Sequence, residues 1–147
     1  MNKFSSLSKD TPATENTFQI DVEGEVTKKR FLGEFTCRIP RRKEQCLIDK
    51  HRAYLNGDLA AMLDPATLQF HHMISYLRYT LMTESVPKFW KESDLGYELY
   101  DANVVQAVYD KVLEFEVDWL TQIWGRDTVN KITGKKDTDG DGKSKTA

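Results

Sequence analysis

The chain has 147 residues, of which 39% are hydrophobic and 30% charged, and its formal net charge at pH 7 is −2. A chain of this length can bury one core without disulfides, and its balanced charge argues against the overall basic composition of a DNA-binding domain. No apolar run approaches the roughly 20 residues of a membrane span, and the N-terminus lacks the apolar core of a signal peptide, so we expect a cytoplasmic protein.

A β-hairpin is predicted near the N-terminus, over residues 17–39. Residues 1–16 are mostly Ser, Thr, Lys and Asn, so we expect a disordered arm there. Phe18–Val22 alternates apolar and polar residues, which is typical of a half-buried strand, and Glu23–Glu25 is predicted to form the turn.

The second strand is expected from about Thr27 to Ile39 and ends before Pro40. Its alternation predicts one buried face, made of Phe31, Phe35, Cys37 and Ile39. Gly33 interrupts this strand, where a bulge or a close backbone approach is expected. Because two strands alone are marginal in water, the hairpin must lie on helices or pair with another copy.

Three helices are predicted, at about 41–55, 65–83 and 103–124. The first has apolar positions at helical spacing and ends at Asn56-Gly57, a left-handed cap; these positions are Leu47, Ile48, His51, Tyr54 and Leu55. The second begins at Asp64-Pro65, as N-cap and first helical residue, and its nearly all-round apolar surface predicts a central position. A loop with the aromatic pair Phe89-Trp90 precedes the third helix.

The third helix carries one apolar stripe, made of Val105, Val108, Val112, Phe115, Trp119 and Ile123. We expect this stripe to share a core with Phe70, Ile74 and Leu77 of the second helix, because each stripe needs a partner. The predicted fold class is therefore α+β, mainly α, with a hairpin packed on about three helices. Residues 17–129 form the predicted single domain, and residues 130–147 a polar, disordered tail.

Charge is unevenly distributed along the chain. Residues 28–52 hold nine Lys or Arg against three acids, a balance of +6, and residues 84–118 hold nine acids against three Lys, a balance of −6. Three interpretations remain open: the first helix packs beside the last, one copy's basic surface meets another copy's acidic surface, or both are solvated faces.

No motif predicts an active site or a cofactor. His71 and His72 are adjacent, so they point about 100° apart on a helix, and the i, i+4 spacing of metalloprotease ligands is missing. Cys37 and Cys46 lack metal-site spacing and are interpreted as reduced, buried thiols. Asp137–Gly142 resembles half of an EF-hand loop, but the twelfth position, where a glutamate is required, falls past the last residue, and we expect no calcium site.

Four acids gather before the last helix: Glu92, Asp94, Glu98 and Asp101. Paired carboxylates can perform acid–base catalysis, but no nucleophile accompanies these in sequence, so a solvated loop is the simpler interpretation. An enzyme would require a pocket in which His51, His71 or His72 meets carboxylates.

The order of features resembles the tail assembly chaperones of long-tailed bacteriophages. The resemblance rests on five segments between residues 18 and 120: Gly33-Glu34-Phe35-Thr36 with Arg38-x-Pro40, Arg52–Gly57, Leu63–Thr67, Val86-Pro87-x-Phe89-Trp90, and Val104–Glu116. It implies a protein that binds the tape measure protein and helps recruit tail tube subunits in the host cytoplasm. It also implies that the protein is lost from the mature particle.

A chaperone of this kind needs exposed apolar and charged contacts rather than a catalytic pocket, and repeated copies gain avidity. The candidate partner-binding residues are Phe31, Leu32, Arg41, Arg42, Lys43, Phe89 and Trp90. For each of the four apolar residues, ordinary packing in the core or a loop is the alternative. A homo-oligomer is a further expectation, whereas membrane binding is not expected. The alternatives are a structural component of the virion neck or tail, and a nucleic-acid-binding phage regulator that uses the basic segment 28–52.

Overall fold

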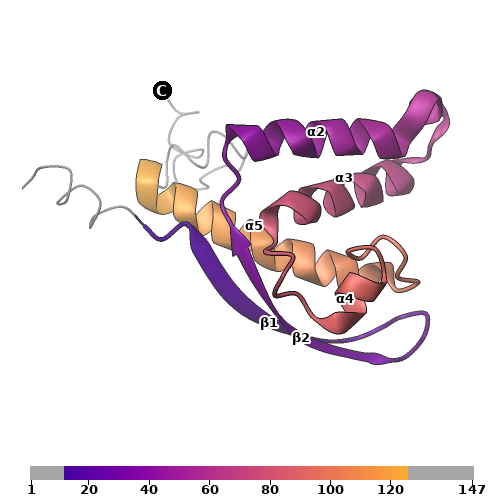
Figure 1. Cartoon of the computed structure of the whole chain (residues 1–147), viewed down its shortest axis with the longest axis horizontal. Helices are drawn as coiled ribbons and strands as arrows, with labels where there is room; N and C mark the ends of the chain where they lie inside the picture. Colours follow the sequence, from indigo (N-terminus) through magenta and orange to yellow (C-terminus); the bar gives the residue numbers. More distant parts are fainter. Residues whose placement is uncertain (1–11, 126–147) are drawn as a thin grey trace, which may run out of the picture. The chain divides into compact units, whose positions relative to one another are not determined.

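The computed structural model describes residues 12–125 (Figure 1). The elements are β1 (Glu15–Glu23), β2 (Arg30–Arg38), α2 (Arg42–Asn56), the 3-10 helix η1 (Gly57–Met62), α3 (Pro65–Thr80), α4 (Lys88–Glu92) and α5 (Ala102–Trp124). This arrangement confirms the α+β, mainly α, fold class. The expected tail at 130–147 and the Asp137–Gly142 loop lie outside the described residues.

The chain divides within α5 into two compact units. One unit spans Thr14–Leu113 and is called the core unit here, and the other includes the distal half of α5 from Glu114. Among the described residues, every buried apolar side chain belongs to the core unit. The sequence pattern predicts a single domain over residues 17–129. The boundary between the two units falls within α5, which is one continuous helix.

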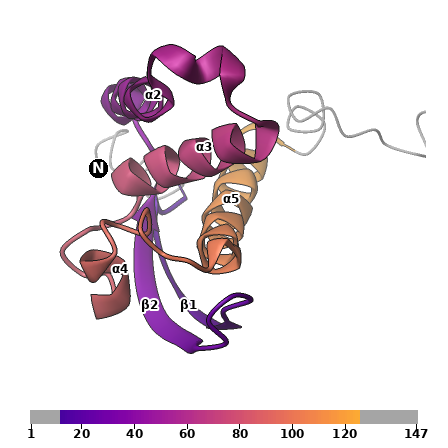
Figure 2. The same cartoon turned by 90° about the vertical axis from the view of Figure 1, so that its right-hand side faces the viewer.

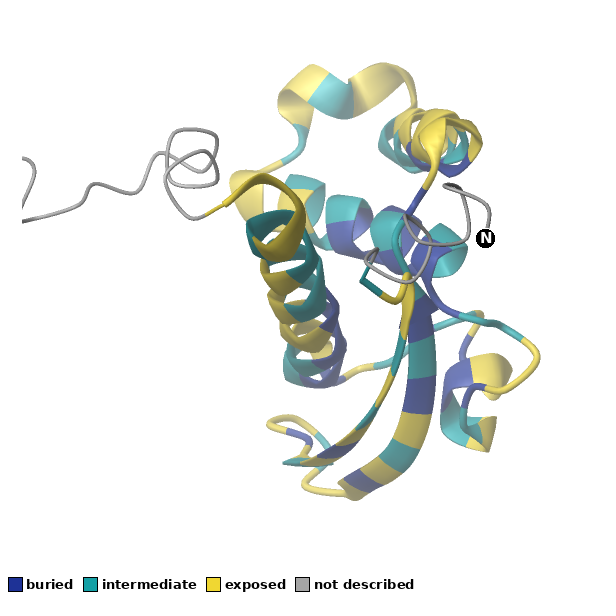
Figure 3. Ribbon diagram, turned by 90° about the vertical axis from the view of Figure 1, so that its left-hand side faces the viewer, coloured by how far each residue is buried: buried dark blue, intermediate teal, exposed yellow. Residues whose placement is uncertain are grey.

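β1 and β2 form an antiparallel hairpin with an unbroken register from Glu15↔Arg38 to Glu23↔Arg30. Along β2, buried and exposed positions alternate as predicted (Figure 3). Gly33 lies directly opposite Ile20, without a bulge. A Cβ at Gly33 would lie 2.3 Å from Cγ of Pro87. Of the two expectations for Gly33, a bulge or a close backbone approach, the structure therefore supports the close approach, to Pro87.

The hairpin differs from its predicted bounds at both ends. β1 begins at Glu15, so the last two residues of the predicted arm at 1–16 belong to a strand. The connection spans residues 24–29 instead of Glu23–Glu25, and β2 starts only at Arg30. The cause is tertiary: the carboxylate of Asp101 accepts hydrogen bonds from the backbone N–H groups of Val26 and Thr27, at 2.7 and 2.9 Å. Backbone N–H groups that donate to this carboxylate cannot also donate to the opposite strand and extend the β1–β2 pairing.

The predicted caps are confirmed at two helix ends. Gly57 ends α2 with a φ of 63°, a left-handed conformation that favours glycine. Asp64 caps α3, because its Oδ1 accepts a hydrogen bond of 2.7 Å from the backbone N–H of Thr67.

α3 ends at Thr80, three residues before the predicted end at Thr83. Leu81 is extended and pairs antiparallel with Cys37, and the N–H of Met82 donates to the carbonyl of Thr36 at 2.8 Å. Hydrogen bonds to the edge of β2 therefore replace those of another helical turn.

Two short helices, η1 and α4, were not predicted. α4 lies in the segment expected to be a loop, and its Trp90 is 1% exposed. The indole ring meets the ring of Phe35 edge to face, with centroids 5.3 Å apart. Gly96 lies against the same indole, since a Cβ there would be 2.7 Å from Cη2 of Trp90. α4 thus anchors the connection between α3 and α5.

Within the core unit, α3 lies between α2 and the first half of α5, as both views show (Figures 1 and 2). Toward α2, Ser75 bonds His51 at 2.9 Å, and toward α5, the ring of Tyr76 meets Tyr109 edge to face at 5.7 Å. The central position predicted for this helix is confirmed.

The predicted core is deepest at five of its members, Ile74, Leu77, Val105, Val108 and Val112, all at most 2% exposed. Phe70, Phe115 and Trp119 are only half-buried, and Ile123 is 40% exposed.

On α2, two residues predicted to be buried are exposed. The α2 face toward α3 buries Ile48, whereas Tyr54 is 79% exposed and Cys46 is also exposed. Both cysteines are thiols, as expected, but only Cys37 is buried. α2 instead buries Glu44, whose carboxylate accepts a hydrogen bond of 3.0 Å from the backbone N–H of Arg41.

Candidate interaction surface

The candidate partner-binding residues fall into two groups. The first group consists of Phe31 and Leu32 on β2 and Phe89 and Trp90 on α4, and Phe31 contacts Phe89. The cationic residues Arg41, Arg42 and Lys43 lie at the start of α2, and all three are exposed.

The aromatic candidates are mostly core residues, which confirms the buried face predicted for Phe31 and leaves little of Phe31 and Trp90 exposed for a partner. Trp90 is 1% exposed and Phe31 8%. Phe89 is half-buried, and its ring meets Phe31 edge to face with centroids 5.0 Å apart. Their hydrophobicity stabilises the contact between β2 and α4. Leu32 is the exception, because 62% of it is exposed.

A groove of about 490 Å³, the hairpin groove, runs between the start of β2 and the connection that precedes α5. Its apolar lining consists of Phe31, Leu32, Phe89, Leu99 and Tyr100. Tyr100 is 81% exposed. Charged residues line the same groove: Lys29, Arg30, Glu92, Glu98 and Asp101. The hairpin groove therefore offers a contact surface of mixed character, with apolar and charged side chains side by side.

Asp101 fixes one wall of the hairpin groove. Besides the two backbone N–H groups, its carboxylate accepts a 2.6 Å hydrogen bond from the Thr27 hydroxyl. Burial acts to raise the pKa of Asp101, but the hydrogen bonds from Thr27 and Val26 outweigh it and lower that pKa overall. Of the four clustered acids, Asp101 thus has a structural role, because it anchors the hairpin connection to the start of α5.

Asn103 adds a second anchor for the same connection. Its side-chain oxygen accepts from the N–H of Glu25 at 3.0 Å, and its amide donates to the carbonyl of Glu23 at 2.9 Å. Gly24 completes the junction, since a Cβ there would lie 2.4 Å from Cγ of Asp101.

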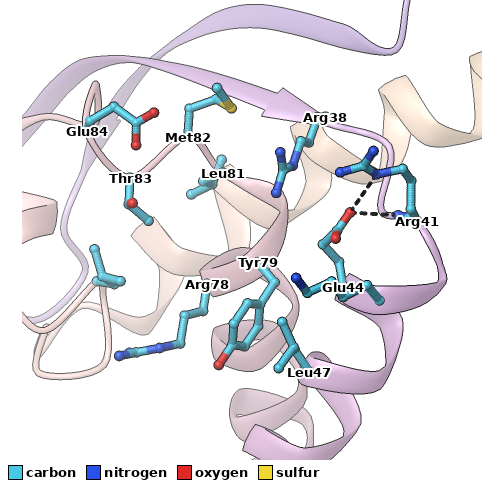
Figure 4. Close-up of a pocket in the computed structure, with 12 residues that line it drawn as sticks. Arg38, Arg41, Glu44, Leu47, Arg78, Tyr79, Leu81, Met82, Thr83 and Glu84 are labelled. Atoms are coloured by element: carbon cyan, nitrogen blue, oxygen red, sulfur yellow. Dashed lines mark hydrogen bonds and ion pairs between the residues drawn. The ribbon is translucent and has the colours of Figure 1, made fainter.

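A second groove, of about 550 Å³, lies where the end of β2, the start of α2 and the end of α3 meet (Figure 4). We call it the basic groove. Four cationic side chains line it: Arg38, Arg41, Lys43 and Arg78. Two carboxylates, Glu44 and Glu84, also line it. Its apolar lining includes Leu47, Leu81 and Met82.

The charges that line the basic groove are partly paired. The N–H of Arg41 holds the pKa of Glu44 below its usual range, and the Arg41 side chain approaches the same oxygen at 3.4 Å. Arg78 lies 3.6 Å from Asp94. Cations therefore still outnumber carboxylates in the lining of an open, partly apolar groove, which favours binding of an acidic surface.

The three histidines bind different partners. His51 bonds Ser75 at 2.9 Å, His71 bonds Asn56 at 2.8 Å, and His72 contacts Arg52 at 3.3 Å. The first pair joins a base to a hydroxyl, but Ser75 is 0% exposed, so no substrate reaches it in this conformation. Within residues 12–125, no group of three or more His, Cys, Asp or Glu is placed to hold a metal ion.

Sequence reasoning identified Arg41 and Lys43 but missed the α3 side of the basic groove. Arg78 is the single Lys or Arg between Pro65 and Thr83. A lone cation on such an apolar helix was the available signal. Leu81 and Met82 carried no such signal, because the sequence pattern predicts that both belong to the helix that in fact ends at Thr80.

No helix in the described part of the chain has the length and apolar character needed to cross a membrane. No family model, curated protein or solved structure matches this chain.

Proposed function

We propose that the chain is a non-enzymatic tail assembly chaperone of a long-tailed bacteriophage, which acts in the host cytoplasm. In this role it binds the tape measure protein and helps recruit tail tube subunits. The order of sequence features from residue 18 to 120 supports the proposal through its resemblance to that family.

The observation that carries the proposal is the hairpin groove. It is open and lined by Leu32, Phe89 and Tyr100, and Asp101 fixes it to the start of α5. A long amphipathic helical partner offers apolar side chains at intervals of three and four residues with charged residues beside them, and a groove with apolar and charged lining can receive such a face. Several copies along one partner would add avidity to weak single contacts.

The nucleic-acid alternative has less support. The basic groove carries Arg38 and Lys43, but Glu44 and Glu84 line the same surface. Carboxylates beside cations repel phosphates and favour a protein partner of mixed charge.

The test is co-purification from infected cells with a tagged full-length chain, followed by mass spectrometry. We expect the tape measure protein or tail tube subunits in the eluate and none of this chain in purified particles. Recovery of the chain at stoichiometric copy number in finished particles would contradict the proposal and favour the structural alternative.

A matched pair of variants tests the hairpin groove itself. Leu32 and Leu59 are equally exposed, at 62% and 61%, and only Leu32 lines the groove. Leu32→Asp should reduce co-purification at least about tenfold, whereas Leu59→Asp should leave it within about twofold. Equal losses in both variants would show that the hairpin groove is not the binding site.

A further inference from the structure

Half of the backbone groups of β1 point away from β2. In an antiparallel pair, alternate residues exchange both backbone hydrogen bonds with the neighbouring strand, and the residues between them face outward. The N–H of Ile39 donates to the carbonyl of Thr14, in the same register as the hairpin, so the even-numbered residues of β1 bond β2. The odd-numbered residues turn their N–H and C=O groups to the outer edge: Glu15, Thr17, Gln19, Asp21 and Glu23.

Only the last residue of this outer edge is held by another element. The carbonyl of Glu23 accepts a hydrogen bond of 2.9 Å from the side chain of Asn103. From residue 15 to residue 21, the outer edge has no backbone partner within residues 12–125. Its polar side chains do not cover it, because they reach toward β2: Thr17 to Thr36 at 2.9 Å, Gln19 to Glu34 at 3.5 Å, and Asp21 to Arg30.

The opposite edge of the hairpin, on β2, is already covered. The N–H of Met82 donates to the carbonyl of Thr36 at 2.8 Å, and Pro87 lies close to Gly33. β1 therefore provides the open edge of the sheet in the described part of the chain.

β1 also lacks most of the features that protect an edge strand from further pairing. It is nine residues long in unbroken register, and it contains no Pro, no bulge and no charge on its inner face. On that inner face, Phe18 and Val22 are only half-buried. A strand beside β1 would place its own side chains next to these two residues.

The charges of the hairpin indicate what kind of strand fits there. The exposed face of β1 carries three acids, Glu15, Asp21 and Glu23, and β1 has no Lys or Arg. On β2, Arg38 lies opposite Glu15 and Arg30 opposite Glu23. Charge thus alternates from strand to strand, so the position beside β1 favours cations. Two copies of β1 paired edge to edge would instead bring like charges together.

We propose that β1 binds an extended segment of a partner protein, which adds a third, antiparallel strand of alternating basic and apolar residues. Backbone hydrogen bonds supply affinity in such strand addition, and alternate side chains supply selectivity. The basic side chains meet Glu15 and Glu23 on the exposed face, and the apolar ones meet Phe18 and Val22 on the inner face. This edge is distinct from the hairpin groove, and its use does not depend on the proposed function.

Amide hydrogen exchange of the purified full-length chain, measured by NMR, tests the proposal. The probe is a synthetic peptide that alternates Lys and Val over about seven residues, the length of the free edge. At about 1 mM peptide, exchange should slow at least about threefold at Thr17, Gln19 and Asp21. It should change little at Phe18 and Ile20, whose N–H groups already bond β2. No slowing at the odd-numbered residues, or equal slowing at all of these residues, would overturn the proposal.

Matched peptides separate hydrogen bonding from charge. In an antiparallel strand whose Lys side chains share the exposed face of β1, the Lys amides face β1 and the Val amides face away. A peptide N-methylated at its Lys residues should therefore lose the effect, whereas one N-methylated at its Val residues should keep it within about threefold. A peptide with Glu in place of Lys should also lose it. Equal slowing by both methylated peptides would contradict strand addition.

A matched pair of proline variants locates the edge on the protein. Gln19 and Glu34 lie directly opposite each other, and the N–H of each points away from the hairpin, on β1 and β2 respectively. Proline lacks this donor and is tolerated on edge strands. Gln19→Pro should abolish the slowing at Thr17 and Asp21, and Glu34→Pro should retain it within about threefold.

Equal losses in the two proline variants would overturn the proposal. If circular dichroism shows that Gln19→Pro does not fold, the methylated peptides decide the question on the wild-type chain. Exchange that slows at Thr17, Gln19 and Asp21 without peptide, as the concentration of the chain rises, would assign the edge to a second copy and also overturn the proposal.

Discussion

At the scale of single residues, His72 makes the contact between α2 and α3 sensitive to pH. Its Nδ1 lies 3.3 Å from Nη1 of Arg52, and because a guanidinium only donates hydrogen bonds, Nδ1 must accept and stay unprotonated. Burial lowers the pKa of His72, the Arg52 charge lowers it further, and Asp49 opposes them. The folded chain therefore favours neutral His72.

The sign of the pH effect follows from this lowered pKa. Below the ordinary histidine pKa of about 6.5, the unfolded chain binds a proton that the folded chain resists, so the free energy of unfolding falls as pH drops. The pKa of His51 is also lowered, mainly by burial, and acts in the same direction. Glu116 acts in the opposite direction, because burial raises its pKa. Its contribution to the free energy of unfolding is present at low pH and is lost as pH rises.

We predict that His72→Gln flattens the loss of stability between about pH 7 and pH 5, relative to the wild-type chain. Chemical denaturation at several pH values measures this difference, in which the effects of His51 and Glu116 cancel. NMR titration supplies the control: the pKa of His72 should rise in Arg52→Gln. A wild-type His72 that titrates at or above 6.5 would contradict the argument.

At the scale of elements, the hairpin depends on a residue far away in sequence. Asp101 and Asn103, at the start of α5, hold residues 23–27 through five hydrogen bonds of 2.6 to 3.0 Å. Hydrogen bonds to a charged acceptor are stronger than neutral ones, and removal of the acceptor leaves its donors unsatisfied. The connection between β1 and β2 is thus held by α5 rather than by its own turn residues.

Asp101→Asn should therefore lower the melting temperature and speed hydrogen exchange of the amides at Val26 and Thr27, because both N–H groups donate to Oδ1 and a neutral amide oxygen accepts hydrogen bonds more weakly than a carboxylate oxygen. Differential scanning fluorimetry and exchange mass spectrometry measure the two effects. Glu98→Gln is the control, since Glu98 is exposed in the same acidic cluster. Equal effects of the two variants would show that the carboxylate of Asp101 does not hold the hairpin.

At the scale of the whole molecule, stability depends on the core around α3. Leu77 is 0% exposed, so Leu77→Ala should cost about 2 to 5 kcal/mol of unfolding free energy through lost burial and a cavity. Leu32→Ala makes the same chemical change at a 62% exposed position and should stay within about 0.5 kcal/mol. Urea denaturation compares them, and similar costs would place Leu77 outside the core.

Local signals in the sequence were enough for the fold class, for both ends of α2 and α5 to within one residue, and for the start of α3. Alternation defines the buried face of β2, and Asp64-Pro65 and Gly57 mark helix ends with their own side chain or backbone chemistry. Each of these signals acts between residues a few positions apart, so it can be interpreted without knowing the fold.

Only the tertiary structure decided features that depend on distant partners. α3 stops at Thr80 because Leu81 pairs with Cys37, and the basic groove forms because Arg78 meets residues of β2 and α2. Burial likewise depends on which face of a helix finds a neighbour, so Tyr54 is exposed and Trp90 is in the core although both are aromatic. The hydrophobicity of a side chain indicates that its burial is favourable. Whether the side chain is buried depends on how the other elements pack around it.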